Sequence, residues 1–106
     1  MKSASRELEA VLHIFLHDEE LKQKALPHVD VARQEMDWGR IFQPDYDSGH
    51  YAAVLWAYSL WRDRPAGSNL FNDSLSMDAG LRRTVIRAIA IRWGIPIDNI
   101  RTLEIA

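Results

Sequence analysis

The chain of 106 residues contains no cysteine. Disulfide bonds, zinc sites built on thiolates and cysteine nucleophiles are therefore excluded. It also has no uninterrupted run of about 20 apolar residues, which is the length that a membrane-spanning helix requires. The apolar residues that follow the N-terminus are too few and too interrupted for a signal peptide. We expect residues 1–106 to fold as a single soluble domain in the cytoplasm.

Motifs for catalysis and for cofactor binding are also missing. The chain has no glycine-rich phosphate loop, no G-x-S-x-G sequence and no H-E-x-x-H sequence. Histidines and carboxylates are present, but their spacing does not pair them as an acid and a base. We expect a protein that is not an enzyme and that carries no cofactor.

Lysine is absent from the second half of the chain. Residues 1–50 contain six Lys or Arg and ten Asp or Glu, whereas residues 51–106 contain seven basic residues, all of them arginine, and five acidic ones. The net charge of −2 gives no general attraction to nucleic acid or to an anionic membrane. Arginine makes planar and bidentate contacts that lysine cannot make, so its exclusive use favours specific contacts inside the chain or with a partner.

The most informative segment that is present carries no charge and runs from Gly49 to Trp61. Wound as a helix, it has two apolar sides, one formed by Val54, Tyr58, Tyr51, Leu55 and Trp61 and the other by Trp56, Leu60, Ala53 and Ala57. A helix that is apolar all round is covered on more than one side. We expect a central helix at about 49–62, on which Trp56 and Leu60 contact a second layer of helices or another subunit.

Apolar residues at helical spacing predict a first helix at 8–16, which Ser3 or Ser5 would cap. The spacing loses its phase near His17, so we expect the helix to break there. Asp18 would then cap a second short helix with acidic residues in its first turn, where the helix dipole favours them.

Pro27 is expected to end that second helix, because the residue before a proline is disfavoured in the helical conformation. Asp30 would cap a further helix that begins at Val31 and is interrupted at Gly39. Ser48, at the end of a turn-forming cluster, is the expected cap of the central helix.

The segment 70–77 fits either an extended strand or a single helical turn. After it, Asp78 is expected to cap a strong helix that ends at Trp93, because Gly94 and Pro96 follow as the usual glycine cap and proline stop. The buried stripe of this helix is expected to consist of Leu81, Val85, Ala88, Ile89 and Trp93, with Ile86 beside them.

The tail at 97–106 fits either a short helix or an edge strand. Taken together, these patterns predict an all-α fold, a compact single-domain bundle of five or six short helices around the central apolar helix at about 49–62.

Two histidines of the first helix have the spacing of metal ligands. His13 and His17 lie one turn apart, and Glu9 and Glu20 would join them on a continuous helix. Metalloprotease helices use two such histidines, but Ile14 stands where their glutamate base would be. The expected break near His17 would also remove Glu20 from the shared face. We therefore expect no tight metal site, and metal binding through His13 and His17 is a distant alternative.

The helix after Asp78 is rich in arginine and has no acidic residue up to position 97. Arg83 and Arg87 are one turn apart and point away from the expected buried stripe. Arg82 and Arg83 lie in the first turn, where the helix dipole disfavours cations, so a negative group should compensate them. Internal acids such as Asp73 or Asp78 could do this, and so could an acidic partner.

The segment at about 86–105 resembles a helix-turn-helix in its spacing. A small residue at Ala90 precedes Gly94 by four positions, and Ile100 follows six positions later. In this interpretation Arg92, Asn99 and Arg101 would contact DNA. Two acidic residues, Asp98 and Glu104, lie in the helix that would enter the groove, and DNA phosphates would repel them.

The first hypothesis is therefore a small non-enzymatic protein-interaction or regulatory module. Its partner would be a second copy or another protein, bound through Trp56, Leu60, Arg83 and Arg87. The alternative is a DNA-binding regulator that uses the segment at about 86–105.

Overall fold

Three long helices, α1 (Arg6–Leu16), α4 (Ser48–Arg62) and α6 (Ala79–Trp93), form the centre of the computed structural model. The structure describes residues 5–67 and 69–96. Within them three shorter α-helices also occur: α2 (Glu19–Lys24), α3 (Trp38–Ile41) and α5 (Leu70–Ser74). The remaining elements are the 3-10 turn η1 (Leu26–His28) and a two-stranded antiparallel hairpin of β1 (Val29–Asp30) and β2 (Glu35–Met36). No helix in these ranges is both long enough and apolar enough to span a membrane.

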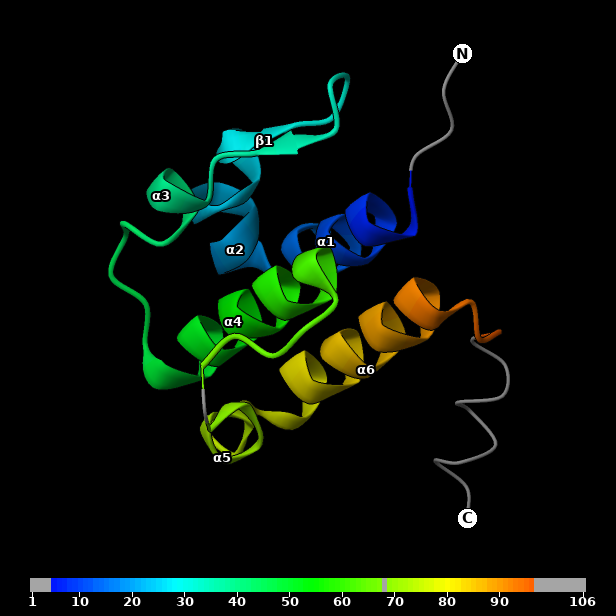
Figure 1. The fold of residues 1–106 in the computed structure, drawn as a ribbon. Helices are drawn as coiled ribbons and strands as arrows, with labels where there is room; N and C mark the ends of the chain where they lie inside the picture. The colour runs from blue at the N-terminus through cyan, green and yellow to red at the C-terminus, as the bar shows by residue number, and fades with distance from the viewer. Residues whose placement is uncertain (1–4, 68, 97–106) are drawn as a thin grey trace.

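Each of the long helices packs against the other two, and together they enclose the core (Figure 1). The largest side chains with no exposed surface are Phe15, Leu8, Ile14, Leu21, Ile41, Val11 and Val54. Small residues of α4, including Ala53 and Ala57, are also fully buried and allow its neighbours to approach closely. The radius of gyration is 13.3 Å, close to the value of about 13 Å expected for a compact domain of 100 residues. The predicted all-α bundle around a central helix is confirmed.

The expected start of α1 and the break after it are both confirmed. The Ser5 hydroxyl accepts a hydrogen bond from the Leu8 amide, and the Asp18 carboxylate accepts one from the Leu21 amide at the start of α2. Pro27 has a different role from the one expected. It lies inside η1, where its fixed φ suits the first turn of a helix.

The helix expected after Asp30 does not form, and this prediction is wrong. Val29 pairs with Met36 and Asp30 with Glu35 in the hairpin. The Asp30 carboxylate accepts a hydrogen bond from the Arg33 amide and so caps a turn rather than a helix. Four residues around Gly39 then form α3.

The central helix α4 begins one residue earlier than expected and is capped by Asp47, not by Ser48. The Asp47 carboxylate accepts from the His50 amide at 2.8 Å, while Ser48 is the first helical residue. Aromatic side chains of α3 and the residue after it cover one side of α4. The ring of Tyr58 lies 4.8 Å from that of Trp38 and 5.5 Å from that of Phe42.

The limits of α6 match the sequence, but its buried stripe is narrower than expected. Asp78 caps the helix by accepting from the Leu81 amide, and Gly94 ends it in the left-handed conformation with φ of 71°. Ile86 and Trp93, however, are 47% and 62% exposed. Ile86 lines a hollow with Phe71 and Leu75, and Trp93 lines another with Leu70 and Pro65. The tail at 97–106 lies outside the described residues.

Candidate functional site

A cluster of exposed apolar side chains lies on α5 and α6. Phe71 is 80% exposed, Leu75 59%, Ile86 47% and Trp93 62%. Large apolar side chains gathered on one surface are unusual for a monomer and mark sites of interaction, whereas isolated ones are common. We refer to the surface between these four side chains, with Trp56 at its base, as the α5–α6 groove.

Trp56 of α4 is half-buried at the base of the groove. Its indole N–H donates to the Ser74 hydroxyl at 2.6 Å, and this hydroxyl donates to the Leu70 carbonyl at the same distance. Trp56 lines two hollows of about 280 Å³ each. One extends toward Phe71 and Ile86, and the other toward Leu60 and Trp93. The tryptophan is therefore oriented by a hydrogen bond and borders both apolar hollows.

The wall that α6 contributes is a regular stripe. Arg82, Ile86, Ile89 and Trp93 recur at spacings of four, three and four residues, which places them on one helical face. This face differs from the one that Leu81, Val85 and Ala88 bury in the core. Arg82 donates through Nη2 to the Leu75 carbonyl at 2.8 Å and lines the same hollow as Phe71 and Ile86.

The residues predicted to bind a partner do not lie on one surface in the structure. Trp56 and Leu60 both border the groove, although Leu60 is only 5% exposed and belongs mainly to the core. Arg83 is exposed on α6 but is not among the residues that line the groove. Arg87 is half-buried on the side of α6 that faces α1, where its charge acts on His13.

The sequence did not reveal Phe71 and Leu75, because the segment 70–77 has no clear periodicity. Both are carried by a helical turn of only five residues and the cap that follows it. The signal that could have found them is their large apolar side chains next to polar neighbours in a segment too short to bury them.

Arg92, one of the candidate DNA-binding residues, is held by contacts within the chain. Its Nε donates to the Leu60 carbonyl at 2.9 Å, and its Nη2 lies 3.3 Å from Glu7 and 3.7 Å from Asp63. The side chain is only 17% exposed. The other two candidates, Asn99 and Arg101, lie outside the described residues.

His13 of α1 and His17, the residue that caps this helix, lie close together, with ring centroids 4.1 Å apart and ring planes tilted by 32°. His17 Nδ1 is 2.8 Å from the His13 carbonyl oxygen, which occupies that nitrogen. Burial, followed by the charges of His17 and Arg87, lowers the pKa of His13 to about 4. Glu20 is not beside this pair. As the break in the helix implied, it lies on α2, where its carboxylate approaches His50 of α4.

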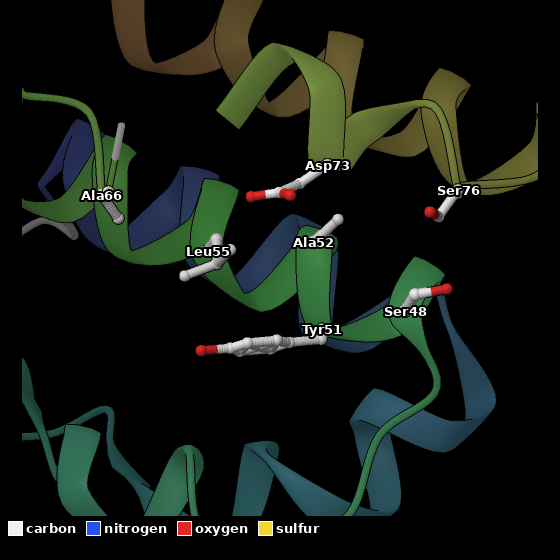
Figure 2. A pocket seen from close by; sticks show the side chains of 8 residues that line it. Ser48, Tyr51, Ala52, Leu55, Ala66, Asp73 and Ser76 are labelled. Atoms are coloured by element: carbon white, nitrogen blue, oxygen red, sulfur yellow. The ribbon is translucent and has the colours of Figure 1, made fainter. Parts of the chain in front are cut away.

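A further pocket, of about 320 Å³, lies between the first turns of α4 and α5. Figure 2 shows Ala52 and Leu55 of α4 facing Asp73 of α5, with Ala66 and Ser76 at the two ends. Its polar groups are hydroxyls and one carboxylate. The lining contains no histidine, lysine or arginine to pair with that carboxylate in acid–base chemistry.

Comparison of the chain with protein-family models, with curated proteins and with solved structures found no match in any of the three. The candidate site is therefore defined by its own geometry. That geometry offers apolar surface, a fixed tryptophan and a neighbouring arginine, which are features of a protein-binding surface.

Proposed function

We propose that this chain is a small non-enzymatic protein-interaction module, and that it binds an acidic amphipathic segment of a partner protein in the α5–α6 groove. The observation that carries this proposal is the exposure of Phe71, Leu75, Ile86 and Trp93 around the fixed side chain of Trp56.

Apolar burial would supply the affinity. Covering one large apolar side chain contributes about 1.5–3 kcal/mol, and the groove offers four that are 47% exposed or more. Part of that gain is lost to the ordering of both partners. Tryptophan is the residue most often found to dominate such interfaces, and both Trp56 and Trp93 border the groove.

Charge favours an acidic partner over a second copy of the chain. Helix α6 has no acidic residue, and of its four arginines only Arg82 lines the groove. Arg82 lies at the groove itself, and Arg64 lines its other end beside Asp63. In a two-fold symmetric dimer through this face the same surface meets itself, and Asp63 is the one acidic residue among those that line it. An amphipathic helix with glutamates beside its apolar stripe would have the complementary charge.

The test uses two synthetic helical peptides with leucines at positions i, i+4, i+7 and i+11. One carries glutamates between the leucines and the other carries lysines in their place. We expect the protein to bind the glutamate peptide at least tenfold more tightly in a fluorescence anisotropy titration. Trp93→Ala and Phe71→Ala should weaken this binding at least tenfold, because each removes an exposed apolar contact.

The matched control is Leu16→Ala. Leu16 is 47% exposed on α1, outside the groove, so its loss should leave peptide binding unchanged. Light scattering reports the solution mass of the same samples. A dimer that Trp93→Ala dissociates would assign the groove to a second copy and contradict the proposal. Absence of binding to both peptides would contradict it as well.

The DNA-binding alternative is tested by gel shift at two salt concentrations. A protein-interaction module should bind duplex DNA weakly and without sequence preference. Nanomolar binding that weakens steeply with salt would replace the proposal by the regulator hypothesis, since each phosphate contact adds nearly one unit to the log–log slope. Loss of Arg101 should then relax the sequence preference, and loss of Arg83 or Arg87 should weaken all sequences equally.

A further inference from the structure

His50, in the first turn of α4, is surrounded by three carboxylates. Its Nδ1 lies 2.9 Å from Oδ1 and 3.0 Å from Oδ2 of Asp47, and 3.8 Å from Oε2 of Glu20. Its Nε2 lies 3.1 Å from Oδ2 of Asp18 on the other side of the ring. The imidazole therefore joins the start of α2 to the start of α4.

The two sides of the ring offer different chemistry. On the Nδ1 side, the ligand atoms of His50, Asp47 and Glu20 all lie within 4.8 Å of one another. Among the described residues, no other group of three His, Asp or Glu side chains has this arrangement. In a tetrahedral site with metal–ligand bonds of about 2.1 Å, ligand atoms are about 3.4 Å apart. The distances of 3.0 and 3.8 Å from Nδ1 differ from this value by only a few tenths of an ångström.

The Nε2 side supplies the outer contact that metal-bound histidines usually have. With Nδ1 bound to a metal, Nε2 carries the proton and its N–H donates a hydrogen bond to the Asp18 carboxylate, which fixes the tautomer and the ring orientation. Asp18 is itself anchored, since its other role is to cap α2 through the Leu21 amide. Asp47 can likewise keep its cap on the His50 amide with Oδ1 and offer Oδ2 to the ion.

The local charge favours a cation. Three carboxylates meet at His50, and Lys24, 3.4 Å from Glu20, is the one lysine paired with them among the contacts of the described residues. The side chains are 20–64% exposed, so solvent can reach the site and complete the coordination.

We propose that His50 Nδ1, the Asp47 carboxylate and the Glu20 carboxylate form a binding site for a divalent transition-metal ion of the zinc type, with Asp18 holding the histidine in position. One nitrogen and two oxygens suit zinc and its neighbours in the first transition series rather than calcium or magnesium, which prefer oxygen ligands alone. The sequence did not suggest this site, because Glu20 lies on another helix, 30 residues before His50, and the three-residue spacing of Asp47 and His50 is also that of an ordinary helix cap.

The experiment is isothermal titration of the full chain with ZnCl2 at pH 7. We expect one ion per chain, and His50→Ala should lower the affinity at least 100-fold. Glu20→Gln and Asp47→Asn should each lower it at least tenfold, and asparagine preserves the cap of α4. Asp18→Asn should lower it by a factor of about 10–100, which is the usual effect of losing an outer-sphere carboxylate. Circular dichroism of each variant checks that it is folded.

The matched control is the double substitution His13→Gln and His17→Gln, which should leave zinc binding unchanged. The proposal is overturned if the wild type shows no binding, or if His50→Ala binds as the wild type does, which would mean that the cluster is an ion pair only. Loss of binding in the double variant would also overturn it and assign the ion to α1. A second readout is the His50 ring signal in NMR spectra, which should shift on zinc addition before that of His17.

Discussion

His13 is a histidine that stays neutral in the folded protein at pH 7, because burial beside His17 and Arg87 lowers its pKa to about 4. In the unfolded chain its pKa returns to about 6.5. Between these values the unfolded state binds a proton that the folded state does not, so stability must fall as the pH falls through this window. The ring is about half-buried, so solvent screening reduces the effect.

We expect the free energy of unfolding to decrease by about 1–2 kcal/mol between pH 6.5 and pH 4 on account of this histidine. Urea denaturation at several pH values measures this, and His13→Gln should show a correspondingly flatter profile. His50 contributes with the opposite sign, because its pKa is raised, but equally in both proteins. Parallel profiles of wild type and variant would contradict the assignment.

Gly49, in the first turn of α4, is required because another part of the backbone approaches it closely. A Cβ at this position would lie 2.8 Å from the Ser76 carbonyl oxygen and 3.4 Å from the Met77 Cα. Backbone cannot move aside as a flexible side chain can. We expect Gly49→Ala to lower the free energy of unfolding by about 1–2 kcal/mol in urea denaturation, despite the better helix propensity of alanine.

The matched control is Gly80→Ala in the first turn of α6. There the new Cβ would meet only Asp78 Oδ1, at 3.5 Å, which is an ordinary contact. This variant should gain up to about 1 kcal/mol, because alanine loses less backbone entropy on folding. Equal effects of the two substitutions would contradict the proposed crowding at Gly49.

At the level of elements, the sequence predicts those helices whose caps and apolar spacing agree. Helix α6 has both, with Asp78 before it and Gly94 after it, and its limits were predicted correctly. The hairpin was missed because Asp30 can cap a turn as readily as a helix, and two-residue strands are too short to show an alternating pattern. The local sequence is compatible with both a helix and a hairpin after Asp30. The hairpin is established only by the pairing of Val29 with Met36.

The candidate groove was only partly predictable. The importance of Trp56 follows from the apolar central helix, but the exposure of Ile86 and Trp93 does not follow from the sequence of α6. Helical spacing shows which side chains share a face, and it does not show whether a neighbouring element is long enough to cover that face. The His50 cluster was unpredictable for a related reason, since Asp18 and His50 are 32 residues apart.

At the level of the whole molecule, Arg92 connects all three long helices. From α6 it donates to the Leu60 carbonyl of α4 and pairs with Glu7 of α1 and with Asp63 at the end of α4. Both the burial of the guanidinium and its three partners distinguish this arginine from a surface ion pair. Arg92 therefore helps to hold the three long helices together. Its removal leaves the Glu7 carboxylate and the Leu60 carbonyl without their charged donor.

We expect Arg92→Met to lower the free energy of unfolding by about 1.5–3 kcal/mol, the usual contribution of hydrogen bonds to a charged group. Methionine keeps much of the apolar stem, so the effect reports the lost polar contacts.

The matched control is Arg40→Met, because Arg40 pairs with Asp37 at 3.5 Å but is 70% exposed and should contribute less than about 1 kcal/mol. Urea denaturation followed by both tryptophan fluorescence and circular dichroism should give one coincident transition for each protein. An Arg92→Met protein as stable as the Arg40→Met protein would show that the three helices are held together by apolar packing alone, and would leave Arg92 available for the DNA contact considered above.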